Sequence, residues 1–281
     1  MASTYDPQLM LSSPEFEGCV LPVDIILQSS DKQRFGAHTK NLECFSEGFP
    51  PAGWVTKQLD EVISLTESSK ILRLLLGFMH NTSLPDLEDD KIAIDTLLSL
   101  CEAAEKYGNF IALQACRRAI LRRAEKTNGE ELLKILRFKI CRSHLEGIDA
   151  VARRTVDIPV RDVWKFCKGY PEVYYFWSRY QIEWFEWESE YADSMNVHSY
   201  QTTHKGAGHC LDLEKWLDCL HSYKRRPDGT YSTWDDFETA RAFMGKMPDV
   251  KTFCGCGGFN QWRVRIKKTF EKQPRWEDFT G

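Results

Sequence analysis

The chain has 281 residues, a size that fits about two domains. Its composition is 42% hydrophobic and 28% charged, which is ordinary for a globular protein and argues against disorder. The formal net charge of −4 lacks the basic excess that nucleic-acid binding requires, so no nucleic-acid partner is expected.

The sequence carries no membrane or secretory signal. Its longest dense apolar stretch, from Ile71 to Met79, is interrupted by Arg73 and Gly77 and is shorter than the ~18 residues of a spanning helix. No basic residue precedes Lys32 and no apolar run follows the N-terminus, so a secretory leader is not expected. The 10 cysteines are therefore expected to be reduced thiols or metal ligands in the cytoplasm and/or nucleus.

Charge is distributed unevenly along the chain. Residues 1–125 carry 12 basic and 18 acidic side chains, whereas the remainder carries 25 and 23. This difference agrees with two units of unlike surface character. We expect a loose N-terminal arm over 1–19, a mixed α+β domain over 20–125, and a mainly α-helical C-terminal domain, rich in aromatics and Cys, over 130–281.

The first half is predicted to be a small fold of short strands followed by helices. Short β-branched runs and alternating patterns predict strands, and apolar residues at helical spacing predict helices. In chain order these are strands over 23–27 and 33–37, a helix over 38–49, a strand over 61–65, a helix that begins after N-cap types at 66–69, and helices over 91–107 and 110–124. In the last helix the expected inward residues are Ile111, Ala115, Ala119 and Leu121, with Arg117, Arg118, Arg122 and Arg123 outward.

Residues at fixed places in this order resemble the BTB/POZ family over roughly 19–124. The matching features are an aspartate in the opening strand, a His at the start of the first helix and the closing run of a later helix: Val23-Asp24-Ile25-Ile26-Leu27, Phe35-x-x-His38-x-x-x-Leu42, Phe49, Val62-x-x-Leu65 and Ala103-Ala104-x-Lys106-Tyr107. The chain departs from the family at 44–49, where many members have Ser-Pro-x-Phe, and in a longer segment over 50–60. The resemblance implies a three-stranded sheet edged by helices.

The function that this resemblance implies is protein–protein association without catalysis. It implies a scaffold or adaptor that forms homodimers through the first helix and the N-terminal arm, or that is recruited to a cullin-type ubiquitin-ligase scaffold. The short apolar-x-Glu recruitment motif of some adaptors has no clear match in this sequence. From their residue types and positions in the sequence, Asp24 and His38 are expected to have structural roles. Asp24 is expected to hydrogen-bond to the backbone or to cap a neighbouring element.

The second half is predicted to be helical. Apolar spacing predicts helices over 130–144 and 145–156, the second with Arg153 and Arg154 in solvent, and Pro159 fits the start of a further element. The run from Cys141 to Val160 resembles, more weakly, the helical segment that follows the BTB domain in fungal (basidiomycete-type) proteins.

An aromatic stripe is the most unusual feature of this half. Over 170–191 its members recur at steps of four and three residues, the seam period of a packed helix: Val173, Trp177, Tyr180, Trp184, Trp187 and Tyr191. A buried core helix is the favoured interpretation, and an exposed groove for a protein partner is the alternative. The interleaved glutamates disfavour stacking on nucleic acid.

The last 85 residues contain a group of side chains that could bind zinc, with His209, Cys210, Cys254 and Cys256 as the best candidates. Zinc sites usually use Cys pairs two to four residues apart, and a single C-x-C does not fit that spacing. Reduced thiols without metal are therefore favoured, and no cofactor is expected. A zinc-stabilised C-terminal binding module remains the alternative function.

Two other features complete the sequence. Residues 263–268 alternate basic and apolar side chains, so they form either a strand with a basic face or a helix on which Trp262, Ile266 and Phe270 share a face. Catalytic motifs are missing, including G-x-S-x-G, the P-loop, H-E-x-x-H and the dinucleotide fingerprint. A cysteine-dependent enzyme is the least favoured hypothesis, and it requires one thiol of depressed pKa.

Overall fold

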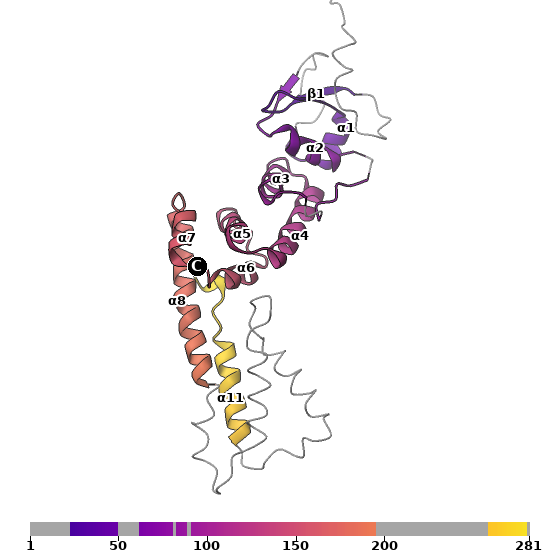
Figure 1. Ribbon diagram of the computed structural model, residues 1–281. Helices are drawn as coiled ribbons and strands as arrows, with labels where there is room; N and C mark the ends of the chain where they lie inside the picture. Colours follow the sequence, from indigo (N-terminus) through magenta and orange to yellow (C-terminus); the bar gives the residue numbers. More distant parts are fainter. Residues whose placement is uncertain (1–22, 50–61, 81–82, 89–90, 195–257, 280–281) are drawn as a thin grey trace, which may run out of the picture. The chain divides into compact units, whose positions relative to one another are not determined.

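The computed structural model describes residues 23–49, 62–80, 83–88, 91–194 and 258–279 (Figure 1). These residues form a three-stranded sheet and are otherwise mostly helical, which confirms the predicted α+β class. The chain divides into two compact units, unit 1 (Met1–Thr127) and unit 2 (Asn128–Gly281). The predicted arm over 1–19 and the long segment over 50–60 lie outside the described residues. No helix in the described ranges has both the length and the apolar character needed to cross a bilayer.

The sheet of unit 1 contains the three predicted strands, β1 (Ile25–Gln28), β2 (Arg34–Ala37) and β3 (Val62–Ser64). Its order is β2-β1-β3, with β1 antiparallel to β2 and parallel to β3. Ser29 closes the β1–β2 turn because its hydroxyl accepts the Gln33 backbone N–H at 3.0 Å. The predicted hairpin is therefore confirmed.

Aspartates from this hairpin cap the first two helices, α1 (Thr39–Phe45) and α2 (Ser69–Gly77). Asp24 accepts hydrogen bonds from the backbone N–H of Thr39 at 2.7 Å and from its hydroxyl at 2.5 Å. Asp31 accepts the equivalent pair from Ser69 at 2.8 and 2.6 Å. Hydrogen bonds from Ser29 and Ser69 lower the pKa of Asp31 to about 2, so this cap is ionised at neutral pH. The structural role expected for Asp24 is confirmed, while the cap of α2 comes from the hairpin and not from its own Ser68.

Helix α1 ends four residues earlier than predicted. The backbone of Ser46 is extended, and the Gly48 N–H donates to the Tyr107 carbonyl at 2.8 Å. Tyr107 is the residue that ends α3 (Ile94–Lys106), so this hydrogen bond fixes the segment after α1 against the end of α3. Phe49 stacks on the Tyr107 ring with the centroids 4.7 Å apart. This contact accounts for an apolar residue at position 49 although α1 has already ended.

Helix α4 (Phe110–Lys126) packs on α3, and its buried face agrees with the predicted one at Ala119 but not at Ile111. Ile111 is 46% exposed, whereas the buried positions are Ala112, Leu113, Cys116, Ala119, Ile120 and Ala124. The side chain of Asn109 caps the helix by accepting the Ala112 N–H at 2.8 Å. The buried face contains small residues such as Ala112 and Cys116 as well as large ones such as Leu113 and Ile120, and it is rotated about the helix axis relative to the predicted face.

Unit 2 consists of helices in its described part. In chain order these are α5 (Gly129–Cys141), α6 (Ile148–Thr155), α7 (Val160–Phe166), α8 (Pro171–Ser194), α11 (Gly258–Glu271) and the 3₁₀ turn η3 (Trp276–Phe279). The helices predicted over 130–144 and 145–156 and the start at Pro159 are confirmed with adjusted ends. Helices α8 and α11 lie side by side (Figure 1).

The aromatic stripe of α8 is the core of unit 2, which confirms the favoured interpretation. All six of its members are buried, and Trp177, Tyr180 and Trp184 are fully so. Tyr180 contacts Trp276 of η3 at 5.4 Å between ring centroids, and Tyr191 contacts Phe270 of α11 at 5.2 Å. Burial raises the pKa of Tyr191 to about 12.

One expectation for the surface of unit 2 needs correction, and one open alternative is decided. Arg153 does not simply lie in solvent, because its guanidinium lies 5.4 Å from the Trp184 ring centroid and contacts the aromatic core. Residues 263–268 belong to helix α11, so the helical alternative holds there. Ile266 on this helix is fully buried, while Arg265, Lys267 and Lys268 are exposed.

Candidate interaction surface

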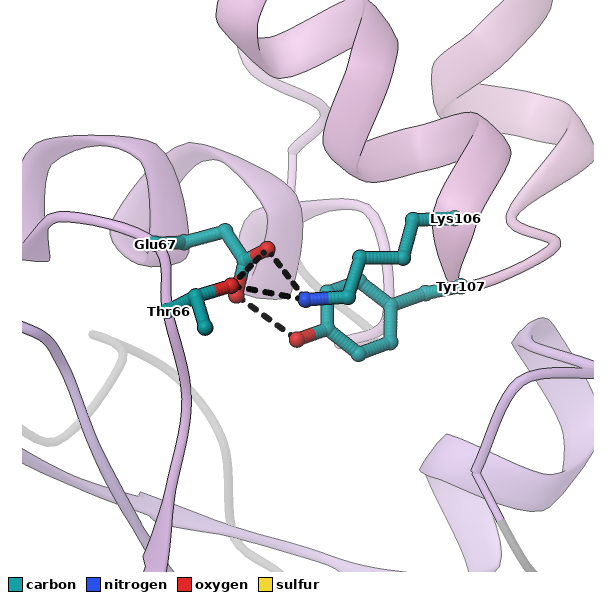
Figure 2. A network of polar contacts seen from close by, with 4 residues as sticks. All are labelled: Thr66, Glu67, Lys106 and Tyr107. Atoms are coloured by element: carbon teal, nitrogen blue, oxygen red, sulfur yellow. Dashed lines mark hydrogen bonds and ion pairs between the residues drawn. The ribbon is translucent and has the colours of Figure 1, made fainter.

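Glu67 is the centre of a polar network that joins the segment before α2 to the end of α3 (Figure 2). Lys106 donates to its carboxylate at 2.7 Å, and the Tyr107 hydroxyl donates to its other oxygen at 2.6 Å. Lys106 also donates to the Thr66 hydroxyl at 2.8 Å. The network therefore holds together two segments about 40 positions apart in sequence.

The charge states of this network are fixed by the contacts. Partial burial opposes ionisation of Glu67, but the hydrogen bonds from Lys106 and Tyr107 outweigh it and lower the pKa of Glu67. The same contact raises the pKa of Lys106, and burial together with Glu67 raises the pKa of Tyr107 to about 12. At neutral pH the network is a carboxylate, an ammonium and a neutral phenol, none poised as a base or nucleophile.

These contacts explain the Ala103-Ala104-x-Lys106-Tyr107 run chemically. Ala103 and Ala104 are buried, and their small side chains allow the helices around α3 to pack closely. Lys106 and Tyr107 then supply the two donors to Glu67. The run therefore has a structural role in unit 1, because it holds the end of α3 against the segment before α2. We call the contacts of Glu67 with Lys106 and Tyr107 the polar lock.

The backbone carbonyl of Tyr107 holds the segment after α1. It accepts hydrogen bonds from the Gly48 N–H and from the Ser46 hydroxyl. A Cβ at Gly48 would lie only 2.6 Å from the Tyr107 Cα, so this approach requires glycine. Glu47 in turn lies against Gly108, where a Cβ would meet the Glu47 Cβ at 2.9 Å. The backbone after α1 and the turn between α3 and α4 thus form one close junction.

Three large apolar side chains that lie within three residues of this junction in sequence are exposed. Phe45 precedes the docked segment, and Phe110 and Ile111 follow the Gly108 turn. We call Phe45, Phe110 and Ile111 the junction surface. Exposed apolar side chains on neighbouring segments are typical of a docking surface. The sequence analysis missed it, although two large apolar residues at the very start of α4, ahead of its buried face, are a signal of exposure.

The two histidines of this unit are buried and contact each other. The His38 and His80 rings meet edge to face with centroids 5.1 Å apart. His80 Nδ1 lies 2.6 Å from the Leu76 carbonyl, as in a donor to that oxygen. Burial lowers the pKa of His80 most, the Leu76 contact opposes that shift, and His38 adds to it. These positions agree with the structural role predicted for His38.

A second set of aromatic residues lies at α7 and the start of α8. The Arg137 guanidinium lies 4.7 Å from the ring centroids of both Phe166 and Tyr170. Trp164 and Tyr174 meet edge to face at 4.9 Å, and Trp164 is exposed. Arg137 therefore braces the α7–α8 corner through cation–π contacts.

The cysteines that the structure describes are free thiols, namely Cys44, Cys101, Cys116, Cys141 and Cys167. A hydrogen bond from Cys116 lowers the pKa of Cys101 and raises that of Cys116. Cys101 is fully buried between α3 and α4. A substrate therefore cannot reach its thiol, although the pKa of that thiol is lowered. Cys44 and Cys141 are exposed, so the alkylation rates of these two thiols test the hypothesis of a cysteine-dependent enzyme.

The predicted zinc ligands His209, Cys210, Cys254 and Cys256 lie outside the described residues. Within the described ranges, no group of three His, Cys, Asp or Glu side chains is placed to hold a metal ion. The zinc hypothesis therefore stays a prediction, and metal analysis of the purified full chain tests it. One bound zinc that is lost with Cys254→Ser and Cys256→Ser supports the hypothesis, and a folded metal-free chain contradicts it.

Comparison of the chain with models of known protein families and with curated protein sequences yields no match.

Proposed function

We propose that this chain is a non-enzymatic protein–protein interaction protein of the BTB/POZ type, acting as a scaffold or adaptor. Its partners on this proposal are proteins, either a second copy through unit 1 or a cullin-type ubiquitin-ligase scaffold. The element order of unit 1 supports the proposal, since a hairpin, a helix and a third strand precede the helices α2 to α4. Residues that carry the resemblance to the BTB/POZ family have structural roles in this chain. Asp24 caps α1, and Lys106 and Tyr107 donate hydrogen bonds to Glu67.

The junction surface is the observation that carries the proposal. Phe45, Phe110 and Ile111 are exposed beside backbone that Gly48 and Tyr107 hold close together. Burying one such side chain is worth roughly 1.5–3 kcal/mol, so a partner that covers all three gains substantial affinity.

The test measures binding of the full chain to a purified cullin-type scaffold by biolayer interferometry, and its self-association by sedimentation equilibrium. The double variant Phe110→Ser, Ile111→Ser is expected to weaken scaffold binding, and any self-association that depends on unit 1, by about tenfold or more. Leu84→Ser is the matched control, because Leu84 is also exposed in unit 1 but belongs to none of its helices or strands.

The proposal fails if the chain binds no scaffold and remains monomeric. It fails equally if the double variant changes neither scaffold binding nor self-association, since the junction surface would then not be the contact.

A further inference from the structure

Helix α8 carries a second apolar stripe on its outer side. Tyr175, Ile182 and Phe185 are 54%, 58% and 46% exposed, although α5, α7, α11 and η3 all pack on this helix. Ser178 and Ser189 continue the same seven-residue pattern between and beyond them. We call Tyr175, Ser178, Ile182, Phe185 and Ser189 the outer stripe. Its steps of three and four residues are the period of a helix that pairs with another helix.

The outer stripe lies opposite the buried aromatic stripe. Tyr175 follows Val173, and Ile182 follows Tyr180, by two residues, a rotation of about 200° around an α-helix. The buried stripe is fully used in the core of unit 2, so the outer stripe is a separate face.

Two exposed charges of opposite sign flank the outer stripe on one side. Arg179 follows Ser178 and Glu186 follows Phe185, so the two are seven residues apart and on the same flank. The Arg179 guanidinium lies 5.9 Å from the Tyr175 ring centroid and 5.5 Å from that of Phe279. A flank that carries a cation and an anion two turns apart is complementary to itself when a second identical helix runs the other way.

We propose that the outer stripe binds the α8 helix of a second copy of this chain, in antiparallel orientation. Ile182 packs on Phe185 of the second copy, and the two-fold axis repeats the same contact. In this register the large Tyr175 faces the small Ala192 at each end, and the small Ser178 faces the small Ser189. Arg179 of each copy meets Glu186 of the other, which gives two ion pairs.

The length of the helix agrees with this register. α8 covers Pro171–Ser194, and the pairing of Ile182 with Phe185 places Val173 opposite Ser194. The two helices therefore overlap over nearly their full length of about 36 Å. Like charges meet only where Glu172 faces Asp193, at the two ends, where both groups are exposed and water screens them.

Other pairings of the outer stripe lose this complementarity. An antiparallel register shifted by one heptad sets Arg179 against Arg179, and Glu186 against Glu172. A parallel arrangement sets Glu188 beside Asp193 and leaves Arg179 without an acidic neighbour across the interface. The charges thus select one orientation and one register.

This association lies wholly within unit 2 and goes beyond the proposed function, on which it does not depend. Substitutions in the junction surface of unit 1 are expected to leave it unchanged.

The first test is sedimentation equilibrium of the full chain over a range of concentrations. Ile182→Ser with Phe185→Ser is expected to weaken the dimer at least tenfold. Val264→Ser is the control, because Val264 is equally exposed but lies on α11. Far-UV circular dichroism checks that each variant keeps its helices. A chain that stays monomeric up to its solubility limit overturns the proposal.

Charge reversal tests the register. Glu186→Arg alone and Arg179→Glu alone are each expected to raise the dimer Kd roughly tenfold, because each replaces two attractions by two repulsions. The double variant restores all pairs with their signs exchanged and is expected to recover affinity to within about threefold. Single changes without effect, or a double variant as weak as the singles, overturn the register.

Thiol crosslinking tests the orientation independently. Ser178→Cys and Ser189→Cys are made as separate full-chain variants and treated with a short bis-maleimide, with the natural chain as the background. Crosslinking that increases when the two variants are mixed supports the antiparallel pairing. Crosslinking of the Ser178→Cys variant with itself, at the level of the mixture, indicates a parallel pair and overturns it.

Discussion

The two units of this protein differ in the side chains that connect distant parts of each unit's own chain. In unit 1, the carboxylates of Asp24, Asp31 and Glu67 accept hydrogen bonds from residues that are distant in sequence. These hydrogen bonds hold the ends of helices in place. In unit 2 the core is a continuous row of aromatic rings shared by α8, α11 and η3. Polar contacts of the first kind specify which segments meet, whereas aromatic burial supplies area and hence the larger free energy.

The largest effect is expected from breaking the aromatic core. Trp184 is fully buried, with ring centroids 5.0 Å from Trp187 and 6.0 Å from Tyr180. Trp184→Ala is expected to lower the free energy of unfolding of unit 2 by about 3–5 kcal/mol, because the cavity adds to the lost burial. Urea unfolding followed by tryptophan fluorescence measures it, since Trp54 is the only tryptophan before residue 128.

The control for that change is Trp164→Ala. Trp164 is half exposed on α7 and contacts Tyr174 at its edge, so its loss is expected to cost about 1 kcal/mol or less. Equal costs for the two substitutions would contradict the assignment of Trp184, and not Trp164, to the core of unit 2.

A smaller effect is expected from breaking the polar lock of unit 1. Glu67→Gln removes the anion that pairs with Lys106 and accepts from the half-buried Tyr107 hydroxyl. The expected cost is about 1–3 kcal/mol, because a partly buried donor loses a charged acceptor. Hydrogen exchange read by mass spectrometry is expected to rise first in peptides from α2 and the end of α3.

The matched control is Glu88→Gln, which weakens the ion pair with Arg122. Both of those side chains are about half exposed, so the expected cost is below about 1 kcal/mol. If exchange in α2 responds equally to both substitutions, the lock around Tyr107 has no special role.

The contrast between the units also explains what the sequence could predict. The aromatic stripe was predictable because its period depends on α8 alone, and the strands were predictable from short β-branched runs. The end of α1 was not, because it is set by Tyr107, some 60 positions away. The capping of α2 by Asp31 and the buried face of α4 likewise depend on tertiary contacts. The exposure of Phe110 and Ile111 was not predicted, because apolar spacing placed Ile111 on the inward face although the position of the pair at the start of α4 was a signal of exposure.

The smallest predicted effect is a loss of stability of unit 1 in mild acid. His80 is buried beside His38, and its pKa in the folded chain lies below the ordinary value of about 6.5. Between that lowered pKa and about 6.5 the unfolded chain binds a proton that the folded chain does not. The free energy of unfolding is therefore fully retained above about pH 6.5 and declines as the pH falls, by at most about 1.4 kcal/mol per pH unit for this group.

Hydrogen exchange of α2 peptides across this pH range, corrected for intrinsic exchange rates, measures the decline. His80→Gln cannot bind the proton, so the variant is expected to have a lower stability at neutral pH and a flatter slope below pH 6.5. The slope is the decisive quantity, since any cavity left by the substitution shifts stability equally at all pH values. A variant with the same slope as the natural chain would assign the acid sensitivity to other groups. The same measurement on α8 peptides sharpens the comparison, because the buried stripe contains no histidine and its stability is expected to stay level over these pH values.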